Sequence, residues 1–205
     1  MTYRNRVDPF GELHATPARG TLMGNRGILH DESGAIRRSH AHPNWVACAL
    51  SFKDRKREIM QPGNYTELFF LDEATALAAG HRPCATCRRE RYRAFTEAWR
   101  RVHGDAPEGW SLPQTIDKAL HAARIDRKRR KVTFEAEAEC LPDGTVFAVG
   151  EEAVLLWQGR EFAWGFEGYR PCAGRTDGDV AVLTPAPVVD VLREGYLPAV
   201  HPSVG

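Results

Sequence analysis

The sequence lacks the long apolar runs of a membrane protein and the apolar leader of a secreted one. No stretch of its 205 residues approaches 18 consecutive apolar residues, about the length that a transmembrane helix needs. Its first residues, MTYRNRVDPFGELH, contain no apolar core of the kind found in signal peptides. We therefore expect a cytoplasmic protein without a membrane partner, and nothing in the sequence indicates an oligomeric state.

Catalytic signatures are scarce as well. The chain has no G-x-S-x-G motif, no glycine-rich loop that would cradle a phosphate and no H-E-x-x-H motif. Asp117 and His121 lie four residues apart in a predicted helix, a spacing that suits a pair of metal ligands, an oriented base or, more simply, a surface ion pair. Because no set of nucleophile, base and orienting group can be assembled, the sequence favours a binding protein over an enzyme.

The charge is nearly balanced overall but is divided unevenly along the chain. The formal net charge is +1. Residues 132–205 carry 12 acidic and 4 basic side chains, a net charge of −8, whereas residues 1–131 carry 15 acidic and 24 basic ones, a net charge of +9. A basic first half predicts contact with a polyanion, and attraction between the two halves is the alternative.

The predicted elements indicate an α+β fold in three parts. Residues 1–20 are polar and are expected to form an N-terminal arm. Residues 21–103 combine strands with a short helix capped by Asp72 and with a longer basic helix. After a linker around Val102–Ser111, residues 111–205 are predicted to form one helix, a small antiparallel β domain and a closing helix.

Cys84 and Cys87 form a C-x-x-C pair, the strongest chemical signal in the sequence. The chain has five cysteines, an odd number that is not spaced like a disulfide framework. A helix start near Arg88 and the surrounding arginines favour thiolates, which bind zinc or act as nucleophiles. Zinc is favoured over a redox pair or two ordinary buried thiols. Cys48, in a predicted strand, is the expected third ligand, and the candidates for the fourth are His30, His40, His42, His81, Cys140 and Cys172.

The segment LDEATALAAGHRPCATCRR, from Leu71 to Arg89, resembles the end of the Ada-like family of metal-binding domains. The short helix followed by RPC-x-x-C carries the resemblance, and the upstream segment MGNRGILH resembles relatives whose first ligand is a histidine. The resemblance spans about residues 22–89, and the C-terminal half resembles no family that we recognise. It implies a Cys₃His zinc site with the ligands His30, Cys48, Cys84 and Cys87.

Two departures from this family affect the expected chemistry. The first two ligands of the family lie only a few residues apart, whereas His30 and Cys48 are 18 residues apart, which implies an inserted hairpin. Ada-type repair transfers a methyl group to a zinc-bound cysteine, but this chain has a histidine at the first ligand position, and an imidazole cannot act as that sulfur nucleophile. The resemblance therefore implies a structural zinc ion.

Basic runs lie near the predicted zinc site and after it. The candidate nucleic-acid contacts are Lys53, Arg55, Arg57, Arg88, Arg89, Arg91 and Arg93, and a further run spans Arg124–Lys131. Such runs can follow phosphates, and a merely solvated surface is the alternative. We expect a zinc-binding protein that contacts DNA or RNA. The alternatives are an enzyme acting on nucleic acid, by alkyl transfer to Cys48 or by hydrolysis, and a metal-stabilised interaction scaffold.

Overall fold

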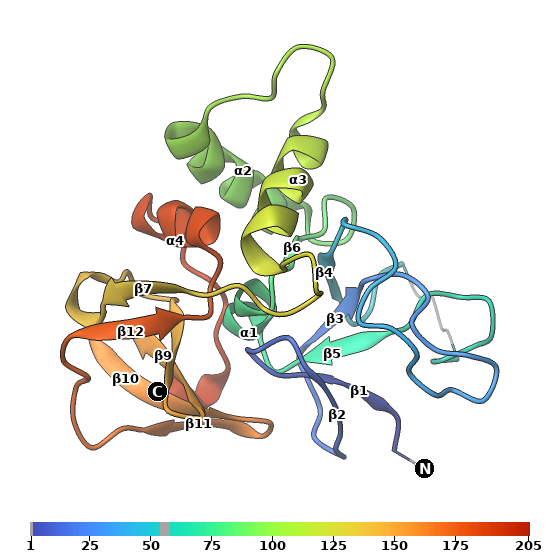
Figure 1. Ribbon diagram of the computed structural model, residues 1–205, viewed down its shortest axis with the longest axis horizontal. Coiled ribbons are helices and arrows are strands. Elements are labelled where there is room, and N and C mark those ends of the chain that lie inside the picture. The colour runs from blue at the N-terminus through green and yellow to red at the C-terminus, as the bar shows by residue number, and fades with distance from the viewer. Residues whose placement is uncertain (1, 54–57) are drawn as a thin grey trace.

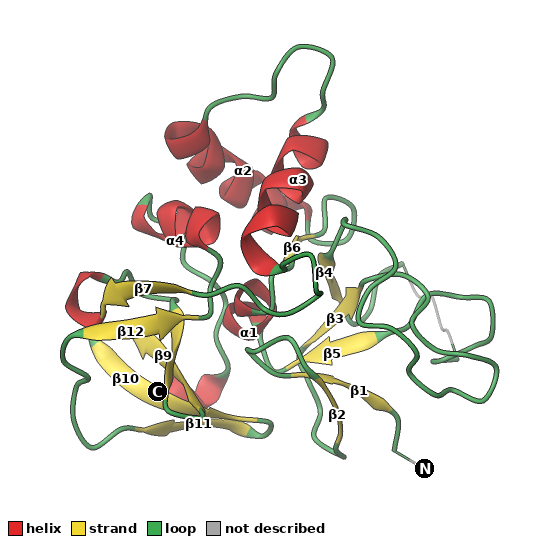
Figure 2. Cartoon of the chain, in the orientation of Figure 1, coloured by secondary structure: helices red, strands yellow, loops and turns green. Residues whose placement is uncertain are grey.

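The computed structural model, which describes residues 2–53 and 58–205, combines helices with two β-sheets (Figure 1). These residues form four α-helices and two six-stranded sheets, one of them entirely antiparallel. The sheets lie on either side of a short central helix, and the other three helices gather on one side of it (Figure 2). The mixed composition and the antiparallel sheet are confirmed, whereas the Ada-like module stays a prediction. Within the described ranges, no helix is both long and apolar enough to span a bilayer.

Each of the helices predicted from the sequence is present. They are α1 (Glu73–Ala78), α2 (Arg89–His103), α3 (Leu112–Arg124) and α4 (Ala186–Arg193), with short 3₁₀ turns at Ala138–Cys140 and Pro202–Val204. Asp72 caps α1, because its Oδ1 accepts a hydrogen bond from the backbone N of Thr75 at 2.8 Å. In α2, Phe95 and Trp99 are four residues apart and are both buried, as the apolar stripe in the sequence predicts.

The first sheet has mixed strand directions. Its strands are β1 (Arg4–Val7), β2 (Leu13–Ala15), β3 (Leu22–Asn25), β4 (Val46–Ala49), β5 (Leu68–Phe70) and β6 (Arg82–Pro83). They lie in the order β2-β1-β5-β3-β4-β6. The β1–β5 and β4–β6 pairs are parallel, and the other pairs are antiparallel.

Residues 4–15 belong to this sheet instead of forming the arm that the sequence predicts for residues 1–20. The strand β1 pairs with both β2 and β5. Asn5 in β1 is fully buried, and its Nδ2 donates a hydrogen bond to the backbone oxygen of Glu67 at 3.0 Å. A buried polar residue in a strand of four residues hides the apolar alternation by which strands are recognised in a sequence.

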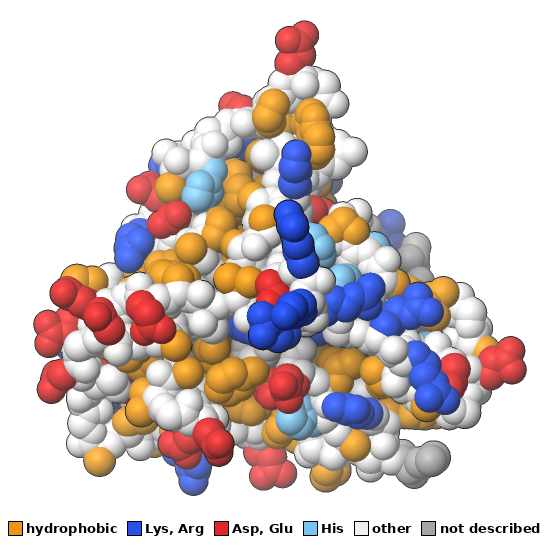
Figure 3. All heavy atoms as spheres, viewed as in Figure 1, with side chains coloured by type: hydrophobic (Ala, Val, Ile, Leu, Met, Phe, Trp, Pro, Cys, Tyr) orange, Lys and Arg blue, Asp and Glu red, His pale blue; other side chains and the backbone are white. Residues whose placement is uncertain are grey.

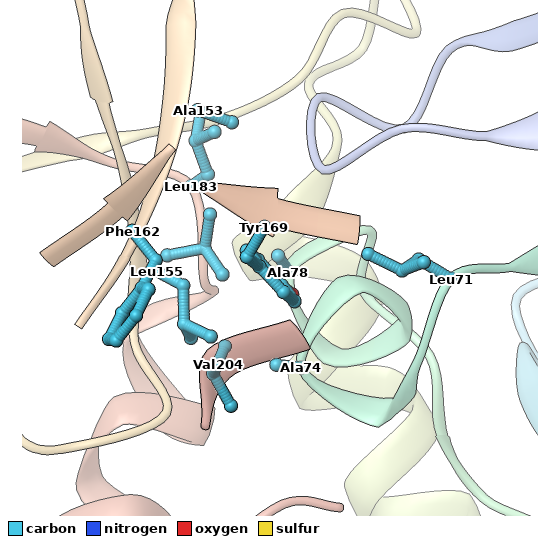
Figure 4. Close-up of a cluster of buried hydrophobic side chains, with 10 residues drawn as sticks. Leu71, Ala74, Ala78, Ala153, Leu155, Phe162, Tyr169, Leu183 and Val204 are labelled. Atoms are coloured by element: carbon cyan, nitrogen blue, oxygen red, sulfur yellow. The ribbon is translucent and has the colours of Figure 1, made fainter. Parts of the chain in front are cut away.

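The second sheet is fully antiparallel and has buried apolar residues on both faces. Its strands are β7 (Phe134–Glu137), β8 (Val146–Val149), β9 (Glu152–Trp157), β10 (Arg160–Gly165), β11 (Gly168–Pro171) and β12 (Asp179–Val182), in the order β11-β10-β9-β8-β12-β7. Leu155 packs in one cluster with Ala74 and Ala78 of α1 (Figure 4). Its neighbour Leu156 packs in another with Val189 of α4. Alternation along the strands thus divides the apolar residues between two faces.

The helix α1 lies at the centre of the molecule, and all six of its residues are buried. Ala74 and Ala78 pack against the second sheet, and Ala76 packs against the first. Leu77 joins the cluster formed by the other three helices. Small alanine side chains let all these elements approach one short helix closely.

The helices α2, α3 and α4 share one hydrophobic cluster that crosses the predicted domain boundary. It contains Phe95 of α2, Leu120 of α3 and Val188 of α4, which are fully buried. The segment Val102–Ser111 therefore connects two helices of the same cluster, and residues 111–205 pack as a continuation of the first half.

Glu73, the first residue of α1, is buried and binds both α2 and the C-terminal segment. Its carboxylate accepts hydrogen bonds from the guanidinium groups of Arg88 at 2.9 Å and Arg91 at 2.8 Å. It also accepts from the Tyr196 hydroxyl at 2.6 Å and from the backbone N of Ala199 at 2.8 Å. Burial opposes ionisation, but the two arginines outweigh it and lower the pKa of Glu73.

Removal of this carboxylate is expected to destabilise the fold. In Glu73→Ala, the Arg88 side chain, which is only 9% exposed, loses its partner and remains as a buried charge. Such a loss costs about 3–5 kcal/mol in the free energy of unfolding, which urea denaturation would measure. Glu97→Ala, at an exposed position of α2, is the matched control and should change stability by about 0.5 kcal/mol or less. Equal losses in the two variants would contradict this role for Glu73.

Candidate metal centre

Three cysteines converge where β4 and β6 run side by side. The strands are parallel, with Ala47 opposite Pro83, so the residues that follow, Cys48 and Cys84, are neighbours. The backbone N of Cys84 donates to the backbone oxygen of Ala47 at 2.9 Å, which ties the two segments together. The turn after Cys84 brings Cys87 to the same place, and α2 begins two residues later.

The positions of the sulfur atoms fit a metal ion. The three Sγ atoms all lie within 4.8 Å of one another, and the three side chains are half-buried. Zinc–sulfur bonds of about 2.3 Å in a tetrahedron place sulfur atoms roughly 3.8 Å apart, so small side-chain movements suffice for binding. Among the described residues, no histidine, aspartate or glutamate joins this group. The cluster therefore supplies three ligands and leaves a fourth coordination position.

Hydrogen bonds among the thiols prepare one of them to ionise. The bond from Cys48 lowers the pKa of Cys84 to about 4 against the effect of burial, and the backbone N–H groups of Cys87 and Thr86 act in the same direction. The same bond, together with burial, raises the pKa of Cys48. Burial raises the pKa of Cys87, although its sulfur accepts a hydrogen bond from the Ala49 backbone N at 3.4 Å. These contacts favour a thiolate at Cys84, and a cation would favour ionisation of the other two thiols as well.

The structure does not bring His30, the predicted first ligand, to the cysteines. Its Nδ1 lies 2.6 Å from the Thr66 hydroxyl, and its Nε2 lies 3.3 Å from the backbone oxygen of Gln61. The predicted hairpin is present, since His30 pairs with Ile36 in an isolated antiparallel bridge. The imidazole is buried, and both of its nitrogens have partners within their own part of the fold.

The other candidates for the fourth ligand are also outside the cluster. In the part of the chain that the structure describes, none of the following joins the three sulfur atoms: His40, His42, His81, Cys140 and Cys172. The ring centroid of His40 lies 5.5 Å from that of Trp45. His81 is fully buried, and its Nε2 accepts a hydrogen bond from Arg26. Cys172 packs against the second sheet.

Asp117 lies in the interior next to this site, and not in a surface ion pair with His121. Its carboxylate accepts two hydrogen bonds from the Arg82 guanidinium, at 2.8 Å and 2.7 Å. Both side chains are only 6% exposed. This bidentate ion pair fixes α3 to β6 close to Cys84 and so helps to hold the backbone of the cysteine cluster in place.

The predicted nucleic-acid contacts divide into arginines that are bonded to Glu73 and side chains that are exposed. Arg88 and Arg91 are bonded to Glu73, so these two arginines serve the interior of the fold. The exposed members are Lys53, Arg89 and Arg93. Arg55 and Arg57 lie outside the described residues.

The structure also contains a cavity that no motif in the sequence indicates. It lies between the first sheet and the loop after α3, and has a volume of about 520 Å³. Eight Lys or Arg side chains line it, against one carboxylate, that of Glu12. We call this space, lined by Arg26, Arg124, Arg129 and Lys131 among others, the basic cavity. A single arginine such as Arg26 carries no periodic signal, so only the folded chain reveals the grouping.

Comparisons of the chain with protein-family models, with curated proteins and with solved structures found no match. What the protein does is therefore inferred from its own residues, and the resemblance to the Ada-like family remains a prediction.

In the metal-free protein, Cys84 is expected to react first with iodoacetamide. Its rate should change little from pH 8 to about pH 5, because a thiol with a pKa of about 4 stays ionised over that range. The rate at exposed Cys140 should fall about tenfold per pH unit, since Glu137 raises the pKa of that thiol. Peptide mass spectrometry after timed alkylation measures both rates. A tenfold fall per unit at Cys84 would refute the preformed thiolate.

Proposed function

We propose that the chain binds one zinc ion through Cys48, Cys84 and Cys87. The convergence of the three Sγ atoms is the observation that supports this most directly. Three sulfur donors suit zinc and disfavour magnesium or calcium, which prefer oxygen ligands. The fourth ligand is water or a group outside the described residues.

The role proposed for this ion is structural. Cys48 precedes Cys84 by 36 residues, so the metal closes a long loop and links β4, β6 and the start of α2. Closure of such a loop by a metal contributes directly to the free energy of folding. The same link fixes the exposed arginines of α2 relative to the first sheet.

We further propose that the basic half of the chain contacts nucleic acid. Of the ion pairs formed by described residues, only two join the basic half to the acidic half: Arg101 with Glu194, and His103 with Asp190. Most of the net charge of +9 in the first half is therefore not neutralised by ion pairs with the second half. In Figure 3, Lys and Arg side chains gather over the loop after α3 and the first sheet, while acidic side chains gather over the second sheet. A surface of this kind follows a phosphate backbone.

The metal proposal is tested by metal content per chain. We expect about one zinc ion per purified molecule, and loss of most of it in Cys48→Ser, Cys84→Ser and Cys87→Ser, because a site with two thiolates holds zinc far more weakly. His30→Ala and Cys140→Ser should retain the ion. Elemental analysis and thermal denaturation with and without a chelator provide the measurements. The site would be ruled out if the purified protein contained no stoichiometric metal, or if the chelator left the melting temperature unchanged.

The nucleic-acid proposal is tested by the salt dependence of binding to random-sequence DNA, both duplex and single-stranded. Replacement of Arg89 and Arg93 by alanine should weaken binding and reduce the slope of log K against log salt by about 2, one unit for each lost phosphate contact. Replacement of Arg170 and Arg175, exposed arginines of the second half, is the matched control and should leave the slope unchanged. Fluorescence anisotropy would measure the affinities. Absence of binding at low salt would defeat the proposal.

A further inference from the structure

Two buried arginines lie beside the same tryptophan at the basic cavity. Arg26 and Arg124 are each 1% exposed, and their guanidinium carbons lie 4.2 Å and 3.9 Å from the centre of the Trp45 ring. Arg26 donates from Nη1 to the backbone oxygen of Gly11 at 2.8 Å, and Arg124 donates from Nη1 to that of Gly80 at 2.6 Å. Both side chains are therefore held in place with their charges close together.

Each charge is only partly compensated by the described part of the chain, since Asp8 favours the ionised form of Arg26 and Asp117 that of Arg124 without forming an ion pair with it. Among the described residues, no carboxylate forms an ion pair with Arg26 or Arg124. Arg26 Nη2 and Arg124 Nε have no hydrogen-bond partner, although they are buried. Asp8, whose charge favours the ionised form of Arg26, is already bonded to His14 at 2.7 Å. Burial lowers the pKa of both arginines to about 9, because the charged form is costly in the interior.

The loop after α3 is built so that it presents more positive charge to the same space. Its ends meet in the bridge between Ile125 and Lys131. The Asp126 carboxylate accepts from the backbone N of Arg130 at 2.9 Å, which stabilises the turn. Arg129 adopts a left-handed backbone conformation with φ of 62°, which is unfavourable for a side chain of this size, and it lines the cavity. Strain in a residue at a cavity wall is typical of a functional position.

We propose that the basic cavity binds the phosphate group of a phosphate monoester, through Arg26, Arg124 and Lys131 at its buried side and Arg38 and Arg129 at its exposed rim. A dianionic phosphate supplies the negative charge and the acceptor oxygens that the two buried arginines lack. The volume of about 520 Å³ leaves room for the organic part of the ester as well. The inference depends neither on the zinc ion nor on nucleic-acid binding by α2, since small phosphate esters serve as its probes.

Calorimetric titration with adenosine monophosphate and with inorganic phosphate tests the site on the zinc-loaded chain. The double variant Arg38→Ala, Arg129→Ala removes two exposed rim charges and should weaken binding of both probes at least tenfold. The double variant Arg89→Ala, Arg93→Ala removes the same charge from α2 and should bind as the unaltered protein does. Equal weakening in the two double variants, or no binding by the unaltered protein, would overturn the proposal.

The source of the phosphate is distinguished by a second pair of probes. A four-nucleotide single strand with a 5′-phosphate should bind at least tenfold more tightly than the same strand with a 5′-hydroxyl if the end of a nucleic acid occupies the cavity. Equal binding of the two strands, together with tight binding of the mononucleotide, assigns the site to a small ester. If the Arg89→Ala, Arg93→Ala variant loses nucleic-acid binding but still binds phosphate in the basic cavity, the two sites are independent and the cavity proposal is supported.

Arg26→Met separates a binding role from a structural one. Because no ion pair compensates the buried charge of Arg26, the variant should be at least as stable as the unaltered protein in phosphate-free buffer, while phosphate should no longer raise its melting temperature. A variant that is less stable but still gains stability from phosphate would show that Arg26 serves only the fold, and would overturn the assignment.

Proton uptake provides an independent signature of the site. The Lys131 ammonium donates to the backbone oxygen of Ala78, and the charged groups that face it are Arg26, Arg124 and Asp8. Burial lowers the pKa of Lys131 to about 7, so at pH 8 most of this side chain is neutral, whereas a phosphate monoester, with a second pKa near 6, is already a dianion. Bound phosphate favours the charged lysine, so binding at pH 8 should take up close to one proton.

The uptake is measured from binding heats in buffers of different ionisation enthalpy, and Lys131→Met should abolish it. Phosphate binding without proton uptake, together with unchanged phosphate affinity in Lys131→Met, would place the anion away from Lys131 and overturn the site as proposed.

Discussion

The complete burial of α1 between two sheets is the constraint on which the rest of the fold depends. A helix of six residues presents very little surface, so its neighbours can pack on every side only because Ala74, Ala76 and Ala78 are small. Burial also encloses the two acidic residues that begin the helix. Asp72 and Glu73 must therefore find partners, and they draw α2 and the segment around Ala199 toward the centre.

The cysteine cluster is an extension of the same arrangement. The strand β6 follows α1 closely, pairs with β4 and ends one residue before Cys84, so the packing of α1 decides where this sulfur lies. Arg82, within β6, is fixed by Asp117, and Arg88, just beyond the cysteines, is fixed by Glu73. Buried ion pairs thus hold the backbone on both sides of the C-x-x-C turn and help to bring the thiols together.

Much of this architecture could be predicted from the sequence because it follows periodic or capping signals. The helix begun by Asp72, the stripe of Phe95 and Trp99, and the alternating second sheet all carry such signals. The C-x-x-C spacing brought Cys84 and Cys87 together for the same local reason. The first strand and the partners of His30 could not be predicted, because contacts between residues such as Asn5 and Glu67 join distant segments and leave no local pattern.

Charge shows this limit most clearly, since Arg88 and Arg89 are adjacent in the sequence but one is buried and the other is exposed. A basic run in the sequence gives the number of cations but does not show which of them face solvent.

The contacts of Glu73 with Tyr196 and Ala199 join residues that are far apart in the sequence. During synthesis on the ribosome, the amino-terminal sheet and its cysteines emerge more than a hundred residues before Tyr196 and Ala199, so the nascent chain stays only partly packed until the segment after α4 has been made.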